Sequence, residues 1–159
     1  MPERLSEQER RAWRNFILLS EAVRREVGRD LWENAQLSET EFTVLAQLAA
    51  APGGLMRSTE CAQALDWDTG RMSHQLRRLE ERGLLERGRG VAGDKRAAVV
   101  SLTHEGLSAY RRALGPHMRS AKRWFLDGLE PDQLDGLDAI LKTLLLHLER
   151  TRPSEGETS

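Results

Sequence analysis

Apolar residues in the first third of the chain recur at three- and four-residue steps, the spacing of amphipathic helices. One stripe runs to about residue 34 and consists of Trp13, Phe16, Ser20, Val23, Val27 and Leu31. A second stripe ends at the breaker cluster 51–54 and consists of Phe42, Leu45, Leu48 and Ala49. Each stripe follows a pair with capping-box spacing, Ser6 with Glu9 and Ser38 with Glu41. We therefore expect two helices, each starting at its capping box.

The middle of the chain changes from helical to strand-like patterns. Residues 55–57 predict a minor strand, and Ser58 is expected to cap a short helix that ends near Trp67. A basic amphipathic helix follows over residues 69–82, capped by Asp68 or Thr69 and closed by Gly83, with its apolar face formed by Met72, Leu76 and Leu79. Two strands at 84–87 and 97–102 then enclose a Gly-rich charged loop, which predicts a hairpin.

Two more helices are expected after the hairpin. Thr103 is positioned to cap a long one, with an apolar line of Leu107, Tyr110, Leu114, Met118, Ala121 and Phe125. Gly115-Pro116 interrupts this line and predicts a kink. Pro131 suits the first turn of the last helix, whose apolar positions form a heptad seam of Leu134, Leu137, Leu141, Leu144 and Leu148. The polar residues 151–159 are expected to be disordered.

The fold class that these elements predict is mainly α with a small β-wing. A helix-turn-helix followed by a two-stranded wing is a DNA-reading arrangement, in which the second helix enters the major groove and the wing reaches the backbone or the minor groove. The chain has 159 residues, which suits one domain or one compact lobe with an appended helical module. It contains no run of 18 apolar residues and no charged-then-apolar leader, so we expect neither a membrane span nor a secretory signal.

The charge distribution favours nucleic acid more than the net charge of −1 does. Residues 69–96 carry eight basic and four acidic side chains, whereas residues 127–159 carry eight acidic and three basic ones. A basic middle segment with an acidic C-terminal segment directs one local face toward phosphate. A merely solvated charged helix is the alternative interpretation of the same pattern.

The segment 61–103 resembles the winged helix-turn-helix of the MarR family of bacterial transcriptional regulators. The similarity rests on the helix TGRMSHQLRRLEERGLL (69–85), on the wing pattern Asp-x-Arg at Asp94 and Arg96, and on Leu102, Thr103 and Gly106, which match Leu-Thr-x-x-Gly. The flanking helices extend the likeness to residues 5–150. The resemblance implies a wing in which Arg96 enters the minor groove and Asp94 orients it.

The candidate DNA-binding residues come from the helix and the wing. A planar guanidinium can hold guanine O6 and N7 with two hydrogen bonds, so Arg71 and Arg77 are the best candidates for base contacts. Thr69, Ser73 and His74 are candidate donors to bases or phosphates. Arg78 is expected to contact phosphate or to pair with an acid in the wing, and Arg89 and Lys95 add attraction for phosphate.

The first and the last two helices carry more apolar surface than a small winged domain could cover. We therefore expect a symmetric homodimer, which would place two recognition helices about one DNA turn (~34 Å) apart. The alternative is a monomer whose terminal helices fold back on the winged lobe. The expected segments are an N-terminal dimerisation helix (1–36), a DNA-binding lobe (37–103), C-terminal dimerisation helices (104–150) and a tail (151–159).

Catalytic, metal and redox functions find little support in the sequence. The four histidines, His74, His104, His117 and His147, lack triad-like or HExxH-like spacing, so we expect no enzyme activity and no cofactor. No cluster of His and Cys with metal-ligand spacing is present, so no metal site is expected. The one cysteine, Cys61, excludes an internal disulfide, fits a reducing cytoplasm and lies on an apolar helix face, where small core packing is expected.

These patterns together predict a cytoplasmic, homodimeric regulator that binds a pseudo-palindromic operator and represses transcription. The resemblance also implies release by a small aromatic or anionic effector. Trp13, Phe16, Trp32 and Trp67 could line a crevice for such a molecule, although aromatic side chains at this spacing more often form core. The alternative function is a protein-interaction module whose basic helix docks on an acidic partner. Loss of affinity for duplex DNA with rising salt discriminates between the two.

Overall fold

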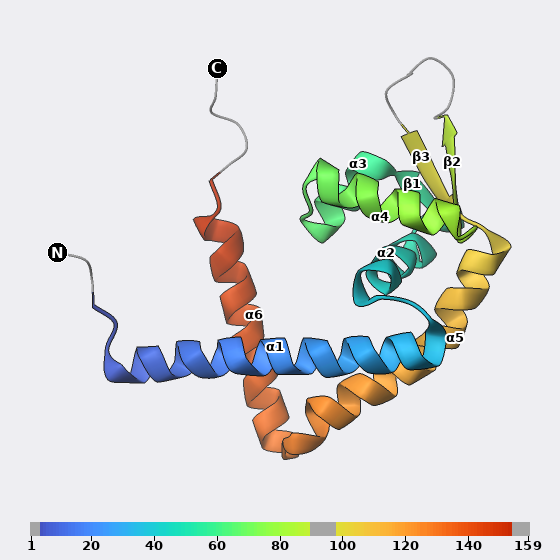
Figure 1. The fold of residues 1–159 in the computed structure, drawn as a ribbon. Helices are drawn as coiled ribbons and strands as arrows, with labels where there is room; N and C mark the ends of the chain where they lie inside the picture. Colours follow the sequence, from blue (N-terminus) through green and yellow to red (C-terminus); the bar gives the residue numbers. More distant parts are fainter. Residues whose placement is uncertain (1–3, 90–97, 154–159) are drawn as a thin grey trace. The chain divides into compact units, whose positions relative to one another are not determined.

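A computed structural model of the chain describes residues 4–89 and 98–153 (Figure 1). They belong to two compact units, residues 1–121 and residues 122–159. The chain is mainly helical with a small antiparallel sheet, as the pattern of apolar residues predicts.

Two capping boxes start the first two helices. The Ser6 hydroxyl accepts from the backbone N–H of Glu9 (3.2 Å), and the Glu9 carboxylate accepts from the N–H of Ser6 (2.7 Å), where α1 (Glu7–Ala35) begins. Ser38 and Glu41 exchange the same two bonds, at 3.1 and 2.9 Å, where α2 (Glu39–Ala50) begins. Both predicted boxes are therefore confirmed. Gln36 separates the helices in a left-handed conformation (φ 54°).

The helix-turn-helix follows a short helical turn, η1 (Pro52–Gly54), and the minor strand β1 (Leu55–Arg57). The expected Ser58 cap is wrong, because α3 (Ser58–Leu65) begins one residue earlier than predicted, with Arg57 at the cap position. The Glu60 carboxylate accepts from the backbone N–H of Arg57 at 3.0 Å and satisfies the end of the helix instead. α4 (Thr69–Glu81) is capped by the Asp68 side chain, which accepts from the N–H of Arg71 at 2.7 Å.

Within the described residues, three strands form one antiparallel sheet in the order β1-β3-β2. β2 (Leu85–Arg89) pairs with β3 (Ala98–Leu102), with Leu85 opposite Leu102 and Arg89 opposite Ala98. β1 pairs with the other edge of β3, with Met56 opposite Val100. The predicted third strand is thus confirmed.

Thr103 and Gly106 join the sheet to α5 (His104–Trp124). The Thr103 hydroxyl donates to the Gly83 carbonyl (2.7 Å) and accepts from the N–H of Gly106 (2.9 Å). Gly106 lies so close to the backbone of Leu84 that a β-carbon would stand 1.8 Å from the Leu84 carbonyl oxygen. The close approach of two backbones therefore explains the glycine in the Leu-Thr-x-x-Gly pattern.

α5 is a continuous helix that contains Pro116. The kink expected at Gly115-Pro116 stays a prediction, because a proline inside a helix removes one backbone hydrogen bond and crowds the carbonyl four residues earlier. The predicted apolar line is wrong in part. The buried face of α5 consists of small residues, Gly106, Ala109, Ala113 and Ser120, while Leu114 and Met118 of the predicted apolar line are exposed.

The core of the first unit lies between α2, α3, α4, the sheet and α5. Its fully buried side chains include Leu31, Leu37, Leu45, Leu48, Cys61, Leu76, Leu79, Leu85 and Val100. α4 contributes its whole apolar face to this core, and only its polar face is left for another molecule.

The second unit contains a short turn, η2 (Leu126–Gly128), and α6 (Pro131–Thr151). Pro131 occupies the first turn, as predicted, and the side chain of Gln133 accepts from the backbone N–H of Glu130 at 2.9 Å. Thr151 is the last helical residue, so the prediction of a tail from residue 151 is wrong at that position. Residues 154–159 lie outside the described residues.

Candidate nucleic-acid interface

The polar face of α4 carries every helix residue that the sequence nominates for DNA contact. Met72, Leu76 and Leu79 are at most 2 % exposed. Gln75 is partly buried, and the exposed positions are Thr69, Gly70, Arg71, Ser73, His74, Arg77, Arg78, Glu80 and Glu81. At 100° per residue, Gly70, His74 and Arg77 lie opposite the core, Arg71 and Arg78 lie along one flank, and Ser73 lies along the other.

Arg71 is held by an aromatic ring at the start of the helix. Its guanidinium carbon lies 4.0 Å from the centroid of the Trp67 ring, within the range of a cation–π contact. Trp67 itself packs against the hydrophobic core. In the structure the Trp67 ring lies against the Arg71 guanidinium, and its place in an effector crevice stays a prediction. The four-residue spacing across the helix start was the available signal.

The centre of the polar face contains a polar cluster around a shallow depression. Arg77 contacts His74 Nδ1 at 3.2 Å and pairs with Glu81 at 4.0 Å. The depression, of about 400 Å³, is lined by Gly70, Ser73, His74, Arg77 and Arg87. Because Gly70 has no side chain, this part of the helix can approach another surface closely.

Arg87 is a site residue that the sequence analysis did not single out. It extends from β2 across the second flank of α4, where its Nη2 donates to the Ser73 carbonyl at 3.3 Å and its Nε pairs with Glu80 at 3.3 Å. The arginine therefore ties the wing to the recognition helix and adds a cation beside the depression. The turn that connects α4 to β2 brings the strand back along the helix, and the contact with Ser73 joins positions 14 residues apart, so no short-range spacing indicates it.

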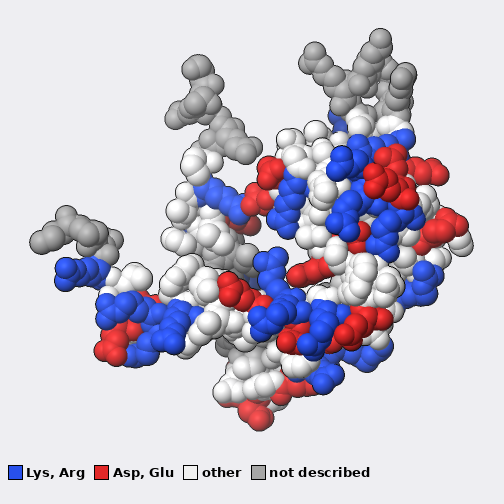
Figure 2. Space-filling model, viewed as in Figure 1, with Lys and Arg blue, Asp and Glu red and all other residues white. Residues whose placement is uncertain are grey.

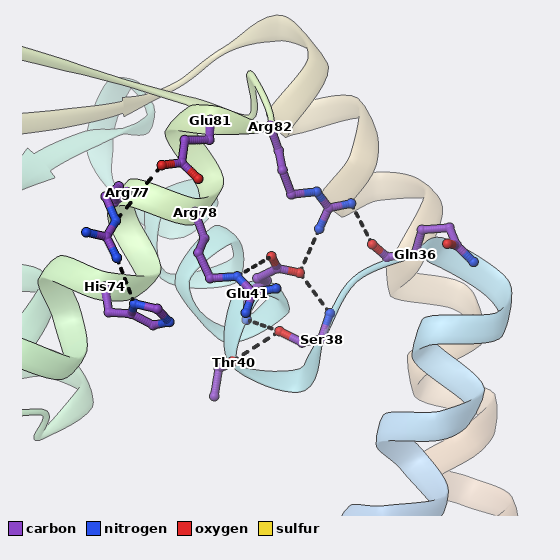
Figure 3. A network of polar contacts seen from close by, with 9 residues as sticks. All are labelled: Gln36, Ser38, Thr40, Glu41, His74, Arg77, Arg78, Glu81 and Arg82. Atoms are coloured by element: carbon purple, nitrogen blue, oxygen red, sulfur yellow. Dashed lines mark hydrogen bonds and ion pairs between the residues drawn. The ribbon is translucent and has the colours of Figure 1, made fainter.

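Arg78 pairs with an acid of α2 rather than with one in the wing. The carboxylate of Glu41 lies 3.8 Å from Arg78 Nε and 2.7 Å from Arg82 Nη1 (Figure 3). Arg82 also donates through Nη2 to the Gln36 carbonyl at 2.6 Å. Glu41 is fully buried, and the three residues connect the C-terminal end of α4 to the α1–α2 junction.

Basic side chains gather over the winged lobe on the face that Figure 2 presents, with acidic side chains among them. Several of the acids are partners of the arginines described above, such as Glu80 with Arg87 and Glu81 with Arg77. Neighbouring groups therefore already restrain the side-chain conformations of these arginines, which reduces the conformational entropy lost when they bind another molecule.

The wing residues cannot be placed in this geometry. Asp94, Lys95 and Arg96 lie outside the described residues, and so does the side chain of Arg89. Their assignment to DNA contact stays a prediction.

The remaining candidate residues have structural surroundings. Cys61 is fully buried, and burial raises the pKa of its thiol, which favours the protonated form. His117 packs on Phe42, with 4.3 Å between ring centroids, and burial lowers its pKa. No group of three His, Cys, Asp or Glu side chains that could hold a metal occurs within residues 4–89 and 98–153. None of the described helices is long and apolar enough to cross a membrane.

Three of the four aromatic side chains proposed for an effector crevice are exposed on α1. Trp13 and Phe16 contact each other, with 5.9 Å between ring centroids, and are 59 % and 53 % exposed. Trp32 is 48 % exposed. These rings form apolar surface that the single chain does not cover.

Comparison with known proteins places the chain among bacterial regulators. Residues 35–97 match the model of the MarR family. The transcriptional regulator PecS of Dickeya dadantii is 30 % identical over 119 residues, which are 74 % of this chain and 70 % of PecS. Among solved structures, AbsC, a MarR family transcriptional regulator from Streptomyces coelicolor, superposes with a TM-score of 0.85 at 29 % identity, over 94 % of this chain and 99 % of AbsC. Sco3205, a regulator of the same family and organism solved in complex with DNA, superposes with a TM-score of 0.88 at 28 % identity, over 99 % of this chain and 97 % of Sco3205.

Proposed function

Since this chain belongs to the MarR family of transcriptional regulators, we propose that it binds a pseudo-palindromic operator as a homodimer and represses transcription there. The family consists of regulators rather than enzymes. In the proposed complex, α4 enters the major groove and the wing contacts the adjacent backbone or minor groove. The DNA complex of Sco3205, which has the same fold, supports this use of the lobe.

The observation that carries the proposal is the division of α4 into two faces. The apolar face is fully used in the core, and the exposed face presents Arg71, Arg77 and Arg78, together with Arg87 from β2. A helix can read a groove only with residues that its own fold does not need. Arg71 and Arg77 are proposed to contact bases, while Thr69, Ser73 and His74 donate to bases or phosphates. For the wing we propose that Arg96 enters the minor groove, that Asp94 orients it, and that Arg89 and Lys95 attract phosphate.

The exposed apolar surface of the terminal helices supports the dimer. On α6, Leu134, Leu141, Leu144 and Leu148 are 40 %, 38 %, 51 % and 52 % exposed, and Leu137 is partly buried. A contiguous apolar seam of this kind marks an interaction surface. We propose that it packs against the same seam of a second copy, with the exposed aromatic side chains of α1 contributing. Release by a small aromatic or anionic effector stays a prediction from the family.

Duplex binding tests the proposal. Operator fragments are selected from genomic DNA with the full chain, and affinity is then measured for the selected and for unrelated duplexes at several salt concentrations. We expect tighter binding to the selected fragments and a fall of log K with log salt whose slope is about −0.9 per phosphate contact. Equal affinity for all duplexes, or binding that salt does not weaken, would contradict the proposal. The second result would favour the protein-interaction module.

A further inference from the structure

The two oxygens of the buried Glu41 carboxylate have different partners. Oε2 accepts both structural hydrogen bonds, from the backbone N–H of Ser38 at 2.9 Å and from Arg82 Nη1 at 2.7 Å. Oε1 is buried, accepts no hydrogen bond from the described residues, and lies 3.8 Å from Arg78 Nε. Figure 3 shows Arg78, in the last turns of α4, and Arg82, just beyond its C-terminal end, approaching the carboxylate. Oε2 therefore stabilises the junction of α1, α2 and α4, whereas Oε1 faces only Arg78.

The two arginines differ as much as the two oxygens do. Arg82 is directed inward, because its two terminal nitrogens donate to Glu41 and to the Gln36 carbonyl. Its side chain is 35 % exposed, compared with 50 % for Arg78. A guanidinium held through Nε can still present its two terminal nitrogens to a phosphate in a fork geometry. Arg78 therefore has the geometry of an external contact, and Arg82 that of an internal tie.

The position of Arg78 on the helix agrees with a DNA contact. Arg71 and Arg78 are seven residues apart, so they lie on the same flank of α4, about 10 Å apart along its axis. Arg71 is held on this flank by Trp67. The flank thus carries two cations, each placed by a neighbour from outside α4: an aromatic ring for Arg71 and a buried carboxylate for Arg78.

We propose that Glu41 is a positioning residue for DNA binding, which acts through Arg78 by holding its guanidinium toward a DNA phosphate. The inference rests on the proposed function and adds to it a residue that does not itself reach DNA. The charges explain the arrangement. Glu41 leaves the group of three with one net positive charge, because Arg82 offsets the buried carboxylate and the charge of Arg78 remains for the phosphate.

Glu41→Gln separates the two roles of the carboxylate. The amide oxygen can replace Oε2, which retains the bonds from Ser38 and Arg82, and the amide NH₂ then faces Arg78 without attraction. We expect Glu41→Gln and Arg78→Gln each to weaken operator binding about tenfold, the scale of one charge-assisted hydrogen bond. We also expect each to reduce the salt slope by about 0.9, the contribution of one phosphate.

The double variant gives the deciding result. If Glu41 acts through Arg78, the variant with both substitutions binds the operator no more weakly than Arg78→Gln alone. The matched control is Arg82→Gln, which removes an internal tie to Glu41 and to the Gln36 carbonyl. We expect it to lower thermal stability while changing operator affinity and the salt slope much less than Arg78→Gln does. If the losses at positions 41 and 78 are instead additive, Glu41 acts only through the fold and the proposal is wrong. Tighter DNA binding by Glu41→Gln would also overturn it, because the carboxylate would then hold Arg78 away from DNA.

Arg78→Lys tests the same idea without disturbing Glu41. Lysine keeps the charge but has no Nε to face the carboxylate and no fork. We expect it to bind the operator as weakly as Arg78→Gln, whereas affinity equal to that of the wild type would show that charge alone suffices and would overturn the positioning role. Binding of the wild type to duplex DNA, measured first, separates a failure of the proposed function from a failure of the role of Glu41. If the wild type does not bind duplex DNA, the proposed function is wrong. If it binds DNA but the substitutions at positions 41 and 78 are not coupled, only the role of Glu41 is wrong.

Discussion

Side chains on and next to α4 divide into those proposed to contact DNA and those that position them. Arg71 and Arg77 are exposed on the polar face, and each has a neighbour that fixes its direction, Trp67 for Arg71 and His74 with Glu81 for Arg77. A preorganised arginine loses less conformational entropy on binding than a freely rotating one. Direct base contacts should therefore depend on residues that do not touch DNA as well as on the arginines.

Replacement of Arg71 or Arg77 with alanine should cost about 1–3 kcal/mol on the operator and relax the preference at particular base pairs. The reason is the loss of a bidentate contact to a base edge. Arg112→Ala, which removes an equal charge from an exposed position on α5, is the control and should leave base preference unchanged. Affinities for a set of operators with single base changes provide the measurement. Uniform weakening on specific and random duplexes would instead assign the arginine to phosphate.

The wing pattern makes a separate prediction for Asp94 and Arg96. Arg96→Ala should weaken operator binding because a minor-groove contact is lost. Asp94→Ala should also weaken it, although it removes a negative charge near DNA, because the arginine would no longer be oriented. Titration of both variants with the operator distinguishes orientation from simple electrostatics. Tighter binding by Asp94→Ala would leave only the electrostatic explanation.

Among the elements, those specified by local spacing were predictable from the sequence. The boxes at Ser6 and Ser38 and the Asp68 cap need only residues within one helical turn, and the minor strand follows from the short segment between the breaker cluster 51–54 and the next helix. The contacts of Glu41 with Arg82 and of Arg87 with Ser73 were not predictable, because they join segments 41 and 14 residues apart. Glu41 was recognised only as a capping residue, and the fold gives it a second role.

The junction between the sheet and α5 depends on one glycine. Gly106→Ala would place a β-carbon 1.8 Å from the Leu84 carbonyl oxygen, so the helix start must move away from the wing. We expect a loss of at least about 1–3 kcal/mol, the usual cost of overpacking a filled site. Gly28→Ala in α1 is the matched control, because its β-carbon meets no atom within 4 Å and alanine favours helix by about 1 kcal/mol. The melting temperature should fall for Gly106→Ala and rise for Gly28→Ala. Equal shifts of the two variants would contradict the close approach of Gly106 to Leu84.

The whole molecule is proposed to function only as a pair. In this proposal one α4 would read one half-site, and a pseudo-palindromic operator would need two such helices about one DNA turn (~34 Å) apart. Most apolar side chains of the α6 seam are exposed in the single chain, and Leu145 beside the seam is 61 % exposed. Surface of this extent is unfavourable in water unless a partner covers it.

Leu141→Asp should dissociate the proposed dimer rather than loosen it. A buried leucine contributes about 1.5–3 kcal/mol, and the substitution also places a charge in an apolar seam, once in each subunit. Because each monomer then offers one helix to one half-site, operator affinity should collapse while every DNA-facing residue is intact. Leu146→Asp is the matched control, because position 146 lies about 150° around α6 from the seam and should leave the dimer intact. Sedimentation at micromolar concentration measures the assembly, and a wild-type monomer that still binds its operator tightly would overturn this architecture.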